Sequence, residues 1–112
     1  MFEPTSYLRQ LGRFSEPALL ILVSLADGPK HGYAILEDAF QFAGVRLGPG
    51  TLYGALARLE SKGLIEALPT DDRRHPYRLT ADGAAALEAE LRQLQSVTTR
   101  GLERLRVAAV AR

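Results

Sequence analysis

The first strong run of apolar residues in this 112-residue chain begins just after Ser15 and covers more than one side of a helix. Ser15 can cap that helix, Glu16 suits its positive end, and Pro17 is tolerated in the first turn. Gly28 and Pro29 end the segment, because glycine adopts the left-handed conformation and proline cannot continue a helix. A helix that is apolar on more than one side belongs in the middle of a core. The apolar positions are Leu19, Leu20, Leu22, Val23, Leu25 and Ala26.

Two further helices are predicted by apolar residues that recur every three to four positions. The first spans about residues 31–42, and its apolar stripe consists of Ile35, Leu36, Ala39 and Phe40. The second spans residues 49–62, and its buried face consists of Leu52, Leu56 and Leu59. The opposite face of this second helix is expected to be small, polar and positive. It consists of Thr51, Ala55, Arg58 and Lys62.

After Gly63 the pattern changes from the period of a helix to that of a strand. Residues 64–68 and 77–79 are predicted to be strands, and the polar segment 69–76 is predicted to be the loop between them. Together they indicate a β-hairpin. Thr80 then caps a last helix, with Asp82 in its first turn.

The last helix is expected to run from Ala81 almost to Val110, although the low helix propensity of residues 98–101 leaves the order of the tail after Thr98 open. At ~1.5 Å per residue such a helix exceeds ~40 Å in length, more than a domain of this size can cover. Its apolar stripe therefore needs a partner, most simply the same helix of a second subunit. The stripe consists of Leu87, Leu91, Leu94, Thr98, Leu102, Leu105 and Ala109.

Three helices, a short hairpin and a long helix, in this order, are the layout of a winged helix-turn-helix domain. We therefore predict a mainly α fold with a small β-hairpin. Residues 15–80 would form the winged helix-turn-helix domain and residues 81–112 a C-terminal dimerisation helix. Residues 1–14 are loosely amphipathic and fit either a short helix or an N-terminal arm.

In the winged layout the third helix enters the major groove of DNA, and the hairpin lies on the neighbouring backbone. The candidate contacts are Thr51, Tyr53, Arg58 and Lys62 in the third helix and Arg73, Arg74 and His75 in the hairpin tip. The free N–H groups at the start of the third helix also suit a phosphate. Plainer interpretations stay open, because Tyr53 could simply pack there, and Asp71 and Asp72 could neutralise the arginines.

Composition narrows the classes of function. A balance of 14 basic and 13 acidic residues gives a net charge of +1, so DNA binding would depend on where the charges lie. The absence of cysteine excludes a disulfide framework and a thiol nucleophile, and it favours the cytoplasm. No apolar run is long enough to span a membrane. His31 and His75 have no ligand cluster around them, so no metal or cofactor is expected, and no catalytic motif supports an enzyme.

Several segments resemble the PadR family of transcriptional regulators, in its short form with a single C-terminal helix. They are GPKHGYAI at residues 28–35, GTLY at 50–53, RLE at 58–60, GLI at 63–65 and YRLTADG at 77–83, and the resemblance covers roughly residues 15–87. It implies a winged-helix domain that binds double-stranded DNA, a homodimer formed through the C-terminal helix, and repression relieved by a small effector. It also implies that Thr51 and Tyr53 hold phosphate.

Two departures from the family pattern matter. Gly54 stands where many members have proline, which is expected to loosen the start of the third helix. The chain has no tryptophan, so an aromatic platform for flat ligands is not evident. A small hydrophobic or aromatic effector could still bind between subunits against Phe14, Leu91 and Leu94, although plain dimer packing explains the same residues.

The alternative to a DNA-binding regulator is a winged-helix module that binds proteins instead. The near-neutral charge and the acidic pair in the hairpin tip motivate it. The sequence leaves open the operator, the regulated genes, the effector and the choice between repressor and activator.

Overall fold

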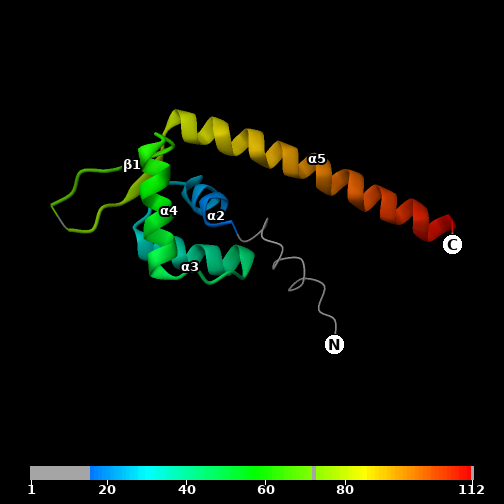
Figure 1. The fold of residues 1–112 in the computed structure, drawn as a ribbon, viewed down its shortest axis with the longest axis horizontal. Helices are drawn as coiled ribbons and strands as arrows, with labels where there is room; N and C mark the ends of the chain where they lie inside the picture. Colours follow the sequence, from blue (N-terminus) through cyan, green and yellow to red (C-terminus); the bar gives the residue numbers. More distant parts are fainter. Residues whose placement is uncertain (1–15, 72, 112) are drawn as a thin grey trace.

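The computed structural model describes residues 16–71 and 73–111, and its elements follow the predicted order. They are helices α2 (Pro17–Leu25), α3 (Gly32–Ala43) and α4 (Pro49–Ser61), strands β1 (Ile65–Ala67) and β2 (Tyr77–Leu79), and helix α5 (Ala81–Ala111) (Figure 1). This is the winged helix-turn-helix layout expected from the sequence. The predictions for residues 1–14, for Ser15 as a helix cap and for Phe14 fall outside the described residues.

Helix α2 forms the centre of the core, as its apolar sequence predicts. It packs against α3, α4, α5 and β2. Leu20, Ile21, Leu22 and Leu25 are buried, whereas Ala26 is exposed beyond the C-terminal end of the helix. The apolar pattern therefore places the helix correctly and extends it one residue too far.

Helix α3 buries a narrower stripe than the sequence predicts. Ile35 and Ala39 are fully buried and Leu36 packs against the core, but Phe40 is 41% exposed. The guanidinium carbon of Arg46 lies 4.1 Å from the centre of the Phe40 ring. The prediction that Phe40 faces the core is wrong, because the ring lies at the edge of the stripe and takes a cation on its face instead.

Helix α4 packs Leu52, Leu56 and Leu59 into the core, as predicted. Ala55 was expected on the solvent side, but it is only 1% exposed, and Ala57 is exposed in its place. The buried positions therefore follow an i, i+3, i+4, i+7 stripe that includes Ala55. The prediction for Ala55 is wrong because its methyl group fits either side of a helix, and only the packing decides.

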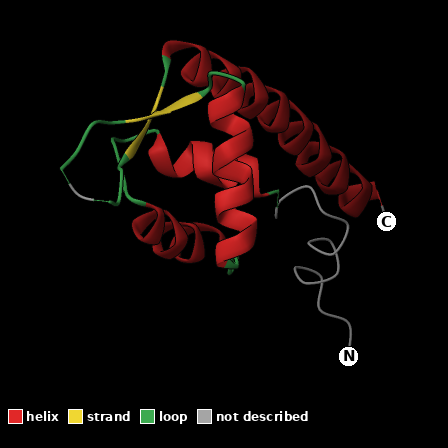
Figure 2. Ribbon diagram, turned by 60° about the vertical axis from the view of Figure 1, so that its left-hand side comes forward, coloured by secondary structure: helices red, strands yellow, loops and turns green. Residues whose placement is uncertain are grey.

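The hairpin is shorter than predicted and is anchored by a third segment. Ile65 pairs with Leu79 and Ala67 with Tyr77, and the Leu68 N–H donates to the Pro76 carbonyl at 2.8 Å. Lys30 forms an isolated antiparallel bridge to Tyr77, with N–O distances of 3.0 and 2.9 Å. This bridge ties the hairpin to the connection between α2 and α3, and the tip projects away from α5 (Figure 2).

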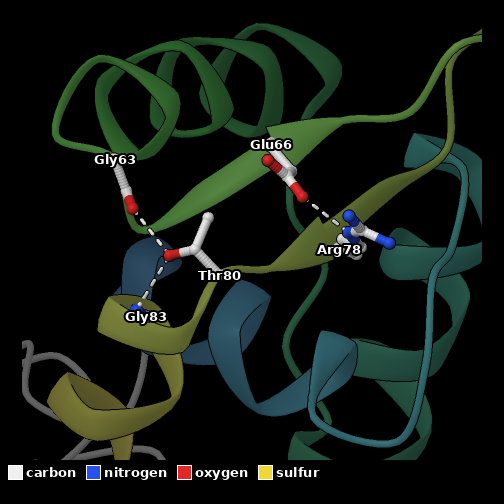
Figure 3. Close-up of polar contacts among 5 residues, drawn as sticks. All are labelled: Gly63, Glu66, Arg78, Thr80 and Gly83. Carbon is white, nitrogen blue, oxygen red and sulfur yellow. Dashed lines mark hydrogen bonds and ion pairs between the residues drawn. The ribbon is translucent and has the colours of Figure 1, made fainter.

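A compact joint connects the end of α4 to the start of α5 (Figure 3). The Thr80 hydroxyl donates to the Gly63 carbonyl at 2.6 Å and accepts from the Gly83 N–H at 3.0 Å. The Thr80 N–H donates to the Leu64 carbonyl at 3.1 Å. Thr80 thus caps α5, as predicted, and at the same time fixes it to the turn after α4.

Helix α5 is a single unbroken helix of 31 residues that runs through residues 98–101. It extends well beyond the other helices (Figure 1), and the molecule measures 63 × 33 × 20 Å. Leu87 is buried against the domain, whereas Leu91, Leu102 and Leu105 on the same predicted stripe are exposed. None of the helices in the described ranges is both long and apolar enough to cross a membrane.

Candidate nucleic-acid interface

The outward face of α4 is smooth at its centre and polar at one edge. Its exposed or half-buried centre consists of Gly50, Gly54, Ala57 and Ser61. Thr51 and Arg58 lie seven residues apart, which places both exposed side chains along one edge of this face. Small side chains let a helix approach a groove floor closely, so the face suits insertion into DNA.

Helix α4 runs unbroken through Gly54, the position at which the sequence comparison predicts a looser start. The Arg58 side chain extends back along the helix, and its Nη1 atom would be 3.6 Å from a Cβ at Gly54. Lys62 is the C-cap residue and is exposed. The predicted groove-side residues therefore all reach solvent, with Lys62 at the far end of the helix.

Tyr53 combines packing with exposure. A Cβ at Gly32 would lie 2.9 Å from its hydroxyl oxygen and 3.3 Å from its Cε1 atom, so the ring rests against the first turn of α3. The side chain is nevertheless 55% exposed. The two interpretations of Tyr53, as a packing residue and as a surface contact, are thus compatible.

The wing tip lies across a groove from the starts of α3 and α4. This groove has a volume of about 710 Å³. Its polar lining side chains are His31, Tyr33, Tyr53, Arg73, Arg74, His75 and Tyr77. Tyr53 and the predicted wing residues thus line the same groove. Thr51, Arg58 and Lys62 are not among the residues that line this groove.

His31 and Tyr33 were not among the candidate DNA contacts, and both line this groove. The whole of α3 and the connection after it separate these two residues from α4, so no local spacing in the sequence links them to that helix. The only sequence signal was their position at the start of a helix, next to Gly32. The packing of α3 against α4 in the helix-turn-helix, and not a sequence pattern, brings them to the groove.

Two tyrosines of this region, Tyr33 and Tyr77, have a raised pKa. A hydrogen bond from the Tyr33 hydroxyl to Glu37 raises the pKa of Tyr33, because the carboxylate favours the protonated phenol. Burial raises the pKa of Tyr77, with smaller contributions from the nearby Glu60 and Tyr53. Both phenols therefore stay neutral across the physiological range.

Comparison with known proteins decides the family. The model of the transcriptional regulator PadR-like family matches residues 21–89 of this chain. This chain belongs to the PadR-like family. The match covers the second half of α2, all of α3 and α4, the hairpin and the first turns of α5.

Individual relatives of this PadR-like chain agree. It is 43% identical over 82 residues to the transcriptional regulator Rv3488 of Mycobacterium tuberculosis, which covers 70% of this chain and 76% of that protein. It is 46% identical over 91 residues, or 81% of this chain, to an uncharacterised 37.1 kDa protein in transposon TN4556 of Streptomyces fradiae. The aligned part is 26% of that protein, so the chain matches about a quarter of its length.

A crystal structure of a PadR family transcription regulator from Clostridium difficile R20291 has the same fold, with a TM-score of 0.71 and 28% sequence identity. The match covers 80% of this chain and 97% of that one. Members of the family are transcriptional regulators and not enzymes, and membership implies that the PadR-like chain regulates transcription by binding DNA.

The predicted effector residues lie elsewhere in this PadR-like chain. Leu91 and Leu94 line a cavity of about 640 Å³ beside α5, together with Leu79 and Leu87. Phe14 falls outside the described residues. In the described ranges no group of three or more His, Asp or Glu side chains is placed to hold a metal ion.

Proposed function

We propose that this PadR-like regulator binds an inverted repeat in duplex DNA as a homodimer and represses transcription from it. Helix α4 enters the major groove, with Thr51 and Arg58 toward the bases and Tyr53 toward the backbone. The wing residues Arg73 and Arg74 contact the backbone beyond it. Two copies of α4 would occupy successive major grooves ~34 Å apart.

The observation that carries this proposal is the outward face of α4. Its leucines are buried, its centre is made of glycine, alanine and serine, and Thr51 and Arg58 lie along one edge of that centre. A face of this kind can lie close to base edges while its polar edge forms hydrogen bonds. The net charge of +1 is small, so these few groups must provide the contacts.

The homodimer is supported by the exposed stripe of α5. Leu102 and Leu105 face solvent in the single chain, and the helix projects past the other described helices and strands (Figure 1). Pairing with the same stripe of a second chain would bury these leucines, which is worth ~25 cal/mol per Å² of apolar surface.

A site for a small effector is a further part of the proposal. The cavity lined by Leu91 and Leu94 opens on the same side of α5 as the proposed dimer stripe. A small hydrophobic or aromatic molecule could occupy it, or the second subunit could fill it. A rise in melting temperature with an aromatic compound, and its loss in Leu94→Ala, would favour the effector.

The DNA-binding proposal is tested by measuring affinity for the DNA upstream of the gene as a function of salt. The logarithm of the association constant falls by ~0.9 per neutralised phosphate for each tenfold rise in salt. Arg73→Ala/Arg74→Ala should therefore lower that slope by about 1.8. Arg100→Ala/Arg104→Ala, which removes the same charge from α5, is the matched control and should leave the slope unchanged. Equal slopes for the wing variant and the wild type would remove the wing from the interface.

A protein-interaction module is the second candidate, favoured by the near-neutral charge and by the exposed Asp71 in the wing. Random duplex DNA at low salt separates the two, because a DNA-binding protein keeps non-specific affinity under those conditions. No binding there would favour the protein-interaction module.

A further inference from the structure

The groove between the wing and the start of α3 brings together side chains from three separate parts of the chain. His31 and Tyr33 come from the first turn of α3, Tyr53 from α4, and Arg73, Arg74 and His75 from the wing. The groove is thus lined by both histidines of the protein and by three of its four tyrosines, Tyr33, Tyr53 and Tyr77. None of the described residues that line it is acidic.

We propose that this groove holds the sugar–phosphate backbone of one DNA strand, and that His31 and Tyr33 are DNA contacts in addition to α4 and the wing. The inference rests on the proposed function and specifies that the backbone of one strand lies between the wing and α3. The strand would pass between the wing on one side and the first turn of α3 on the other. The wing and the helix-turn-helix would then bind one continuous stretch of backbone together.

Charge and hydrogen-bonding capacity favour a phosphodiester in this groove. Arginine binds phosphate oxygens through its planar fork, and imidazole and phenol donate single hydrogen bonds to them. His31 occupies the N-cap position of α3 but makes no side-chain capping hydrogen bond, so its exposed ring does not serve the helix. The His75 ring is oriented by the wing itself, with Nδ1 3.4 Å from the Leu68 carbonyl oxygen.

Tyr33 and Tyr53 would act differently. The Tyr33 side chain is 67% exposed, and the carboxylate of Glu37 on the next turn of α3 would repel a phosphate near the phenol oxygen, so this tyrosine would present the face of its ring to a strand. That face suits packing against a deoxyribose. Tyr53 would use its hydroxyl instead. This hydroxyl lies against the start of α3 and can donate a hydrogen bond to a phosphate there.

Gly32 positions Tyr53. A methyl group at residue 32 would lie 2.9 Å from the Tyr53 hydroxyl oxygen and 3.3 Å from its Cε1 atom. Gly32→Ala would therefore push the phenol out of its present place while leaving every donor of the groove in the chain. The same methyl group would lie 3.3 Å from Cδ2 of the buried Leu52, so both DNA affinity and stability should fall.

The test measures fluorescence anisotropy of the full chain with a labelled random-sequence duplex of about 25 base pairs, which spans two successive major grooves. His31→Ala and Tyr33→Ala should each weaken binding by about fivefold, the effect of losing one net contact. Tyr33→Phe should bind like the wild type, because only the ring of Tyr33 is used. Gln41→Ala, at the other end of α3, is the matched control and should have no effect. Since backbone contacts carry no sequence information, the losses should be equal on operator DNA.

A double-mutant cycle between His31→Ala and Arg73→Ala tests whether the two sides share one strand. The effects of two substitutions are not independent when both side chains bind the same segment of a ligand. The loss of affinity in the double variant should therefore be at least about threefold smaller than the product of the two single losses. His31→Gln repeats the cycle should His31→Ala prove unfolded by circular dichroism. Strict additivity would mean that the wing and α3 bind separately, which contradicts the proposal.

Three further outcomes separate the groove proposal from the proposed function. If the wild type binds duplex DNA but His31→Ala and Tyr33→Ala bind equally well, the groove does not hold a strand, although the proposed function stands. If inorganic phosphate at matched ionic strength displaces the duplex as no chloride salt does, the groove is a site for a free anion. If the wild type binds no duplex at low salt, it is the proposed function that fails.

Discussion

Gly83 and Gly101, both in α5, have opposite effects on the stability of the fold. A Cβ at Gly83 would lie 1.9 Å from the Leu64 carbonyl oxygen, whereas nothing lies within 4 Å of a Cβ at Gly101. Glycine in a helix interior costs about 1 kcal/mol relative to alanine. Gly83 is therefore needed for the close approach of two backbones, and Gly101 is a weakness without a compensating contact.

Replacing each glycine by alanine should give effects of opposite sign. Gly83→Ala should lower the free energy of unfolding by about 3 kcal/mol, because a backbone carbonyl cannot move aside without displacing β1. Gly101→Ala should raise it by about 0.5–1 kcal/mol. Urea denaturation followed by circular dichroism, at one protein concentration, measures both. An unchanged midpoint for Gly83→Ala would mean that α5 does not start against the turn after α4.

At the scale of the elements, α4 carries two alanines on opposite sides, Ala55 and Ala57. Ala55 is buried beside Leu52 and Leu59, and Ala57 lies in the centre of the outward face. The first serves the packing of the helix, and the second would serve its approach to DNA.

Ala55→Glu should lower the free energy of unfolding by several kcal/mol, because an unpaired carboxylate would be buried in the core. Ala57→Glu should change stability by no more than about 0.5 kcal/mol, since the position is exposed. It should nevertheless weaken DNA binding by at least about tenfold, because the new charge would face phosphates. Thermal denaturation and fluorescence anisotropy on the same samples measure the two properties. Tight DNA binding by Ala57→Glu would contradict the proposed orientation of α4.

Much of the element structure could be predicted because the helices are long enough for the apolar period to fix them. The predicted ends of α3 and α4 agree with the structure within one residue. The bridge between Lys30 and Tyr77 could not be predicted, since a single pair has no period. The groove was missed for a related reason. His31 and Arg73 are far apart in sequence, and only the tertiary fold brings them to the same surface.

At the scale of the whole molecule, the apolar stripe of α5 is covered at Leu87, but Leu102 and Leu105 further along it are exposed. Leu105 lies on this stripe, and Val107, two residues further, points to the opposite side of the helix. Both side chains are 67% exposed in the single chain. Exposure alone does not distinguish them, and only a second subunit would.

Leu105→Glu should therefore dissociate the proposed dimer, because it places a charge in the apolar seam, whereas Val107→Glu should leave it intact. The expected increase in the dimer dissociation constant for Leu105→Glu is at least about tenfold, which follows from losing one buried leucine. Sedimentation equilibrium measures this constant, and the affinity for a two-half-site duplex should fall with it. Equal behaviour of the two variants would exclude pairing through this stripe.

The joint at Thr80 and Gly83 has a geometric consequence for the choice of operator. It fixes the direction in which α5 leaves the end of α4, and α5 acts as a lever ~46 Å long. A rotation of about 5° at the joint would move the far end of that lever by about 4 Å, more than one base-pair step. In a dimer held together through α5, the number of base pairs between the two half-sites would therefore be determined by two hydrogen bonds to one threonine hydroxyl, at a distance from any residue that touches DNA.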